Sequence, residues 1–391
     1  LSHRNQILLN ILSNALHNEK KVKIANDWQS VKNELIAQSV YAIPANSIEL
    51  NDEDAIEYLQ LVGRNVQVFH QLMQEQQDLI YLLENNGIPV VILKGASAAM
   101  SYPIPENRCM GDIDIIVKPD DFEKAFHLLC QNDYTNKDTL EKYHRHIGFL
   151  TQSGIEVELH NYFSTSDNGE QNAVLDNLIY AAIDKRTVVS VCGYDASVLP
   201  TLETGIVLLA HINQHLGTGL GLRQIIDWMC FVEKHLDDEL WNSGFANTAD
   251  SVGMKQLAVA VTAMCRKHLG LNAEISWDKL PDNFVVDELM EYILAHGNFG
   301  RKDTITSKTI SVIRGFRNPI KGLKMAQETG LRTWKLLDRH KWLKPFAWLY
   351  QICRWVVRGK KGGASISSAM ADSKQEQYET DLLSKIGVTR L

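Results

Sequence analysis

The chain has 391 residues, of which 45% are hydrophobic, enough for two or three domains with apolar cores, and its formal net charge is −7 at pH 7. Its six cysteines form no Cys-x-x-Cys pair and no regular framework, which argues against a disulfide-rich secreted protein. No apolar run reaches the length of a membrane span, and the first residues lack the features of a signal peptide. We therefore expect a globular, cytoplasmic protein with reduced thiols.

Residues 6–83 carry apolar side chains at three- and four-residue spacing, which predicts helices. A break is expected near Ala45, and residues 1–84 would form an N-terminal helical cap beside a sheet. The predicted apolar stripes contain Ile7, Leu8, Ile11 and Leu12, and later Leu59, Val66, Phe69 and Leu72.

The segment after this cap begins with an apolar run that ends at Lys94 and Gly95. The run predicts a strand, and the small residues 96–100 predict the start of a helix. A glycine at this position lets backbone N–H groups approach phosphate oxygens, and a helix N-terminus favours anions. Lys94 and Arg108 would supply positive charge to the same anion, and Ser97 lies in the same turn.

Asp112 and Asp114 stand at the head of the next apolar run. Because side chains alternate along a strand, both carboxylates point to one face, whereas Ile113 and Ile115 point to the other. Neighbouring carboxylates repel, and a hard cation such as Mg²⁺ relieves the repulsion while keeping positions open for water and phosphate. The pattern predicts a metal-binding strand, with a solvated turn as the alternative.

A helix is predicted at residues 119–129 by its first-turn proline and the acidic residues beside it. A Gln-Ser-Gly turn signal further on then predicts a hairpin, in which a strand ending at His160 folds back on residues 144–151. Glu156, Glu158 and His160 would share one face of that strand. A third carboxylate beside the aspartate pair would complete a site for two metal ions, which orient a triphosphate and activate a hydroxyl.

In this order, the segments resemble the uncharacterised bacterial nucleotidyltransferase family within the polymerase-beta-like superfamily. The residues that carry the resemblance are Val91–Gly95, Arg108, Gly111–Val117 and Val157–His160. The resemblance implies an α/β (α+β) fold with a small mixed-sheet nucleotidyltransferase core, flanked by N-terminal and C-terminal helical regions. The chain departs from the wider pattern because Lys-Gly-Ala replaces Gly-Ser and because the gap from Gly95 to Asp112 is long.

By the same resemblance, Gly95 corresponds to the turn glycine, Asp112 and Asp114 to the metal-binding pair, and Glu158 to the third carboxylate. The three acids would be both catalytic and metal-binding, with Mg²⁺ or Mn²⁺ as the cofactor and a nucleoside triphosphate such as ATP as a substrate. The expected nucleotide-binding residues are Lys94, Gly95, Ser97, Arg108 and Gly111.

The next helical stretch, at residues 202–235, contains two polar pairs. His211 and His215 are one turn apart and could hold a metal, but the glutamate that a zinc protease needs after the first histidine is missing. We favour a structural pair or a wall of the acceptor pocket. Arg223 and Asp227 are typical of an i,i+4 ion pair, with a nucleotide contact as the alternative. The candidates for supporting the metal ligands are His160, His211 and Arg223.

Positive charge is concentrated in residues 301–361, which hold 16 Lys and Arg against 3 Asp and Glu, a local charge of +13. Such a block attracts nucleic acid, anionic lipid or an acidic partner without specifying which. Helical spacing of its tryptophans favours packed helices with solvated arginines over a membrane or RNA surface. A linker is predicted after Gly359 and a last helix at residues 376–385. The four tryptophans are Trp334, Trp342, Trp348 and Trp355.

The sequence thus predicts a nucleotidyltransferase that moves a nucleoside monophosphate from a triphosphate to an unknown hydroxyl-bearing acceptor. One alternative is a catalytically silent nucleotide-binding module of a biosynthetic complex, against which the three carboxylates argue. Another is a toxin-neutralising enzyme that modifies a protein or tRNA. The predicted regions are an N-terminal cap at 1–84, the catalytic core at 85–198, a helical domain at 199–300, and a basic Trp-rich helical region with a linker at 301–391.

Overall fold

We describe the protein from a computed structural model. It describes residues 1–17, 20–24, 27–137, 145–164, 169–216, 219–280 and 283–298, and then 323, 326–327, 330–331, 334–338, 340–361 and 381–386. The chain divides into two compact units, residues 1–299 with 385–391, and residues 300–384. The predicted cap, core and helical domain therefore fall together, almost entirely, in the first unit.

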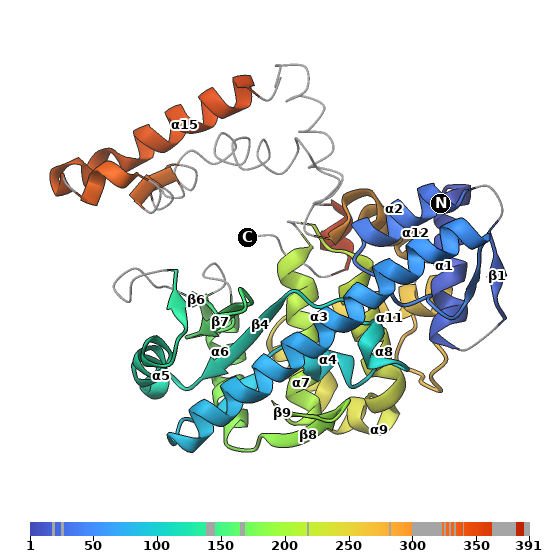
Figure 1. The fold of residues 1–391 in the computed structure, drawn as a ribbon, viewed down its shortest axis with the longest axis horizontal. Coiled ribbons are helices and arrows are strands. Elements are labelled where there is room, and N and C mark those ends of the chain that lie inside the picture. The colour runs from blue at the N-terminus through green and yellow to red at the C-terminus, as the bar shows by residue number, and fades with distance from the viewer. Residues whose placement is uncertain are drawn as a thin grey trace. The chain divides into compact units, whose positions relative to one another are not determined.

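Five strands form the central sheet of the first unit, in the order β3-β4-β7-β6-β5. β4 and β7 are parallel and the other neighbours are antiparallel, so the predicted mixed sheet is confirmed (Figure 1). The expected hairpin of β6 and β7 forms around the predicted turn. The strands are β3 (Val90–Ile92), β4 (Asp112–Val117), β5 (Thr135–Asn136), β6 (His146–Leu150) and β7 (Glu156–His160).

One face of this sheet is apolar and packs on two helices, α3 (Asp52–Asn85) and α5 (Pro119–Gln131). α5 begins at Pro119, as its start signal predicts. Because strand side chains alternate, burying the apolar residues on this face sends the acidic residues between them to the opposite face. The buried strand residues are Ile113, Ile115, Ile147, Phe149, Val157 and Leu159.

The N-terminal region is helical, as predicted, but its buried stripe differs in one place. The prediction for Leu59 is wrong, because this side chain is 60% exposed. Its neighbour Tyr58 is buried instead, together with Val62 and Asn65. The Asn65 amide donates to the backbone oxygen of Glu106 at 2.8 Å, so a polar residue occupies a position that an apolar pattern cannot identify. The region also contains α1 (His3–Leu16), β1 (Val22–Lys23), α2 (Trp28–Ala37) and β2 (Ile48–Glu49).

The segment after the sheet is mostly helical. The stretch predicted as helical at residues 202–235 is two helices, α7 (Thr201–His215) and α8 (Leu222–His235), which pack on each other. Gly219 lies between them with a φ of 117°, which interrupts the helix. The remaining elements of this unit are α4 (Ala96–Ala99), η1 (Pro105–Asn107), α6 (Gly169–Ile183), β8 (Thr187–Val191), β9 (Tyr194–Val198), α9 (Asp238–Leu240), η3 (Trp241–Phe245), α10 (Ala246–Ser251), α11 (Lys255–Leu269) and α12 (Asn283–His296).

The predicted basic block lies largely outside the described residues, which leave out 301–322 entirely. In its described part, the ring of Trp334 stacks on that of Tyr350 with centroids 4.7 Å apart, as expected of a packed tryptophan. Trp342, by contrast, is 70% exposed, so the packing prediction is wrong there. It lies in a short 3₁₀ segment and does not share the stripe that α-helical spacing predicts. The elements are η5 (Lys335–Asp338), η6 (Lys341–Phe346) and α15 (Ala347–Lys361).

The C-terminal predictions are only partly covered. α15 continues through Gly359 to Lys361, past the expected start of the linker, and residues 362–380 lie outside the described part. Residues 381–385, at the end of the predicted last helix, are helical.

All six cysteines are free thiols, as predicted, and three of them are buried. Among the helices that the structure describes, none combines the length and apolar character needed to cross a membrane.

Candidate functional site

Three carboxylates meet on the polar face of the sheet. Asp112 and Asp114 project from β4, and the parallel register places Asp114 directly beside Glu158 of β7. Each acid offers one oxygen, and these three oxygens lie within 4.8 Å of one another. The three side chains line a cavity of about 220 Å³. Carboxylate oxygens at this spacing are the donor set that Mg²⁺ or Mn²⁺ takes, so the residues fit such an ion.

The two aspartates differ in their surroundings. The ammonium Nζ of Lys94 lies 2.8 Å from Asp114 Oδ2, and His160 Nε2 lies 3.0 Å from Oδ1. Burial alone would raise the pKa of Asp114, but Lys94 and His160 outweigh it and hold this pKa well below its usual range. Repulsion from Asp114, together with burial, raises the pKa of Asp112. Asp112 therefore carries the repulsion that a bound cation would relieve.

His160 lies between two of the acids. Its Nε2 is 3.3 Å from Glu158 Oε2 as well as 3.0 Å from Asp114 Oδ1. Burial works to lower the pKa of His160, but the two carboxylates raise it overall. Burial works to raise the pKa of Glu158, and the neighbouring His160 lowers it overall. His160 thus contacts Asp114 and Glu158 directly, and its role in supporting metal ligands stays a prediction.

The turn after β3 requires its glycine. Gly95 has φ 65° and ψ −109°, a conformation that residues with a Cβ avoid, and a Cβ there would lie 3.1 Å from Met110 Cε. Lys94 and Gly95 both line the cavity. Ser97, a predicted nucleotide contact, is buried away from it, and its hydroxyl donates to the backbone oxygen of Leu93 at 3.3 Å.

Arg108 forms a buried ion pair with Asp227. Its Nε and Nη2 donate to the two oxygens of Asp227 at 2.7 and 2.8 Å, and the Tyr102 hydroxyl donates to the same carboxylate at 2.7 Å. All three side chains are buried. Arg108 borders the cavity, but this bidentate pair joins the segment before β4 to α8. The sequence assigned Arg108 to the nucleotide and Asp227 to Arg223, so it did not predict this pair.

Arg223 brings a positive charge to the cavity wall near Gly111. Its Nη1 donates to the backbone oxygen of Cys109 at 3.1 Å, and both Arg223 and Gly111 line the cavity. Burial lowers the pKa of Arg223, with Asp112 among the acids that oppose this shift. An anionic group of a ligand would therefore be favoured beside Arg223 in the cavity.

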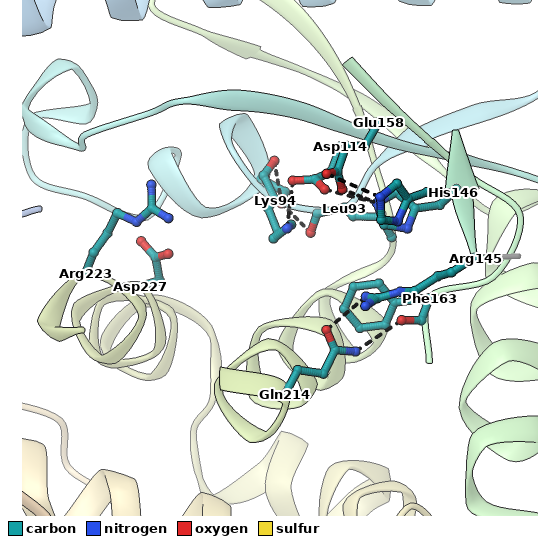
Figure 2. Close-up of polar contacts among 12 residues, drawn as sticks. Leu93, Lys94, Asp114, Arg145, His146, Glu158, Phe163, Gln214, Arg223 and Asp227 are labelled. Atoms are coloured by element: carbon teal, nitrogen blue, oxygen red, sulfur yellow. Dashed lines mark hydrogen bonds and ion pairs between the residues drawn. The ribbon is translucent and has the colours of Figure 1, made fainter. Parts of the chain in front are cut away.

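Arg145 lines the same cavity and was not predicted from the sequence. Its Nη2 donates to Gln214 Oε1 at 3.0 Å, while Gln214 Nε2 donates to the backbone oxygen of Phe163 at 3.1 Å. The guanidinium carbon also lies 5.7 Å from the centre of the Phe163 ring. Figure 2 shows Arg145 and Arg223 on opposite sides of Asp114 and Glu158. No local motif marks Arg145, which reaches the cavity as the residue before β6.

His211 and His215 both line the cavity, and whether they form a wall of the acceptor pocket stays a prediction. Their rings are 4.6 Å apart and almost perpendicular. Burial lowers the pKa of His211 well below its usual range and that of His215 to about 4. Both rings are therefore neutral at pH 7. Among the described residues, neither belongs to a cluster of three or more possible metal ligands.

Comparison with known proteins gives one family. Residues 25–270 match the model of a family described as uncharacterised nucleotidyltransferase, and this range includes every residue that lines the cavity. No curated protein matches the chain. The chain is also similar to the crystal structure of an antigenic nucleotidyltransferase-like protein from Paracoccidioides brasiliensis, with 14% identity and a TM-score of 0.31 over 52% of this chain and 94% of that one.

Proposed function

Because the chain belongs to the uncharacterised nucleotidyltransferase family, we propose that it transfers a nucleoside monophosphate from a nucleoside triphosphate to a hydroxyl group of an acceptor. The observation that carries the proposal is the cluster of Asp112, Asp114 and Glu158, whose oxygens lie within 4.8 Å in a cavity that also contains cationic side chains. Nucleotidyl transfer needs both kinds of group, because the acids hold metal ions and the cations stabilise phosphate charge.

The three acids would hold Mg²⁺ or Mn²⁺. When bound, such ions neutralise phosphate charge and lower the pKa of the attacking hydroxyl. The protein's own contribution is to hold the carboxylates in place, through the register of β4 and β7 and through the contacts of Lys94 and His160 with Asp114.

The positions of the cationic residues suggest which side of the site each substrate occupies. Arg223 is influenced by the charge of Asp112 and lines the cavity with Gly111, and there it would bind phosphate oxygens of the triphosphate. Arg145, held by Gln214, is influenced by the charges of Asp114 and Glu158 and lies on the opposite side. We assign the acceptor to that side, where Glu158 would hold the nearer metal ion or accept the acceptor's proton.

The proposal is tested by following the label of a triphosphate. Protein, Mg²⁺ and each of the four nucleoside triphosphates are incubated with fractionated cell extract, with the label on the α-phosphate or on the γ-phosphate. The α-label should enter an acceptor and the γ-label should not, because pyrophosphate leaves. Entry of the γ-label would indicate a kinase and contradict the proposal, and so would absence of any transfer across all four triphosphates.

A matched pair of variants shows whether the transfer uses this site. Glu158→Gln should lose transfer while it retains triphosphate binding, because Asp112 and Asp114 remain. Glu156→Gln is the control, since Glu156 is two residues away on the same strand, is half-exposed and lies 2.7 Å from Lys137 Nζ. Equal losses in the two variants would contradict the assignment of Glu158.

A further inference from the structure

A second cluster of metal-ligand atoms adjoins the three acids. His146, Glu158 and His160 each offer one ligand atom, and these atoms lie within 4.8 Å of one another. The hairpin register explains the cluster, because His146 of β6 is directly opposite His160 of β7, and Glu158 is two residues from His160 on the same face. Gly148 is the residue directly opposite Glu158 in this register.

The spacing of the atoms is that of ligands around one small cation. His146 Nε2 lies 3.5 Å from Glu158 Oε1, and His160 Nε2 lies 3.3 Å from Glu158 Oε2. Ligands about 2.0–2.2 Å from a tetrahedral ion are roughly 3.3–3.5 Å from one another. Each observed separation is of this length, one to each oxygen of Glu158, and one ligand atom from each of the three residues lies within 4.8 Å of the others.

Both imidazole rings place Nε2 within 3.5 Å of a Glu158 oxygen, and Nε2 of His160 also lies 3.0 Å from Asp114 Oδ1. Within the described part of the chain, the Nδ1 atoms of His146 and His160 are buried and have no hydrogen-bond partner. The polar contacts of the two rings are therefore made through Nε2. The cluster is also accessible, because the side chain of His146 is 37% exposed and both histidines line the cavity.

We propose that His146, His160 and Glu158 bind a second cation, of the manganese, cobalt or zinc type, next to the one held by Asp112 and Asp114. Glu158 is shared between the two positions. The inference deepens the proposed function, on which it rests for its role in transfer, by giving the acceptor side of the site a nitrogen-rich ion site. Binding of the ion itself does not depend on catalysis.

The ligand types decide the class of metal. Mg²⁺ prefers an all-oxygen environment, whereas imidazole nitrogen suits first-row transition metals. Metal-bound histidines usually donate their other nitrogen to a neighbouring group, which strengthens binding 10- to 100-fold. Since neither Nδ1 atom has such a partner among the described residues, we expect a weakly held, exchangeable ion and not a structural zinc.

The test is pulsed electron paramagnetic resonance of Mn²⁺ added to the full chain in excess Mg²⁺. Mg²⁺ competes for the all-oxygen position, so Mn²⁺ that remains bound should show modulation from imidazole nitrogen. His146→Ala should remove part of that modulation and weaken Mn²⁺ binding at least about tenfold. His146 is the residue to change because its ring is partly exposed, and the melting temperature of the variant confirms that it folds. His160→Asn provides a second variant.

The matched control is His127→Ala. His127 Nε2 also lies near a glutamate, 3.7 Å from Glu123 on the exposed side of α5, but it is not at the site. This variant should leave the modulation and the affinity unchanged. Absence of nitrogen modulation in the wild type, or equal signals in the His146 and His127 variants, would overturn the inference.

The α-label assay on the same preparations separates the two proposals. Transfer without nitrogen modulation would overturn the second cation site and leave the proposed function standing. Nitrogen modulation without transfer would support the site and contradict the function.

Discussion

Two carboxylate sites in the first unit, at Asp227 and at Asp112, have opposite character. The Asp227 carboxylate accepts two hydrogen bonds from Arg108 and one from Tyr102, and all three side chains are buried. Asp112 instead faces Asp114 and Glu158, and repulsion from Asp114 raises its pKa. A carboxylate held by a buried arginine and a tyrosine is structural, whereas one that lies beside other carboxylates is arranged for a ligand from outside.

The comparison predicts that neutralising a carboxylate has opposite effects on stability at the two sites. Removing the charge of Asp227 leaves Arg108 buried without its partner, which destabilises the folded protein. Removing the charge of Asp112 relieves repulsion and does not. The variants below would break or sharpen this distinction.

The largest effect is expected from Asp112→Asn. Transfer should fall by about 10²- to 10³-fold, the range for loss of one group that stabilises charge in a transition state. Because the raised pKa of Asp112 means that its ionised form is disfavoured in the folded state, the melting temperature without metal should stay the same or rise. Initial rates and thermal melting check the two effects, and unfolding of the variant would show that Asp112 is structural.

Asp114→Asn tests whether the two aspartates differ in their effect on stability. Asp114 pairs with Lys94 and His160, so the ionised form is favoured in the folded state. This variant should lose transfer and also melt at a lower temperature than Asp112→Asn. Indistinguishable melting temperatures would contradict the different roles of the two aspartates.

The next effect is on stability. Asp227→Asn should lower the free energy of unfolding by about 3–5 kcal/mol, the range for breaking a buried ion pair, as measured by urea denaturation. Asp184→Asn is the control, because Asp184 is 61% exposed in its pair with Lys118, and exposed pairs contribute about 0–1 kcal/mol. If Asp227→Asn lowered the free energy of unfolding by less than 1 kcal/mol, Asp227 would not be a structural residue.

A smaller effect is expected from Arg223→Gln. Arg223 is the guanidinium that we assign to the triphosphate, so triphosphate affinity should fall about tenfold, equivalent to about 1.4 kcal/mol. The free energy of unfolding should change little, because the variant removes a buried charge whose pKa burial already lowers. Equilibrium binding of a non-hydrolysable triphosphate provides the measurement. Arg145→Gln, on the opposite side of the site, should weaken binding of the acceptor and leave triphosphate affinity unchanged.

The smallest effect concerns acid stability. The pKa of His215 is about 4 in the folded state and 6.5 in the unfolded chain, so the unfolded chain takes up a proton first as the pH falls. Stability is therefore lost between pH 6.5 and about 4, and His215 has no such effect above this window. His215→Gln should reduce the loss between pH 7 and pH 5 by on the order of 1 kcal/mol. Parallel stability curves for the two proteins would contradict the assignment.

The sequence predicts the acids of the site because their placement depends on local rules. Alternation along one strand puts Asp112 and Asp114 on one face, and a turn signal sets the hairpin that delivers Glu158. The glycine between strand and helix predicts the turn at Gly95 in the same way. These rules act over a few residues, which is why the acidic face could be predicted without a structure, whereas the mixed sheet was expected from the family resemblance.

The partners of the arginines could not be predicted, because they depend on long-range packing. Arg108 and Asp227 are 119 residues apart in sequence, and their pairing exists only once α8 has docked. Arg145 and His146 stand in no motif. The strand register places His146 opposite His160, and Arg145 reaches the cavity as the residue before β6. The local i,i+4 rule for Arg223 and Asp227 did not identify the bidentate partner of Asp227, since a helix-surface rule does not describe a buried helix face.

The central claim, that the cluster at Asp112 is arranged for a ligand from outside, is tested most directly by the rise in melting temperature that Mg²⁺ and a non-hydrolysable triphosphate produce together. A ligand at 100 times its dissociation constant stabilises the folded state by about 2.7 kcal/mol. We expect this rise in the wild type, a loss of it in Asp112→Asn, and no comparable rise with the triphosphate alone. An undiminished rise in Asp112→Asn, or a full rise without Mg²⁺, would contradict the account.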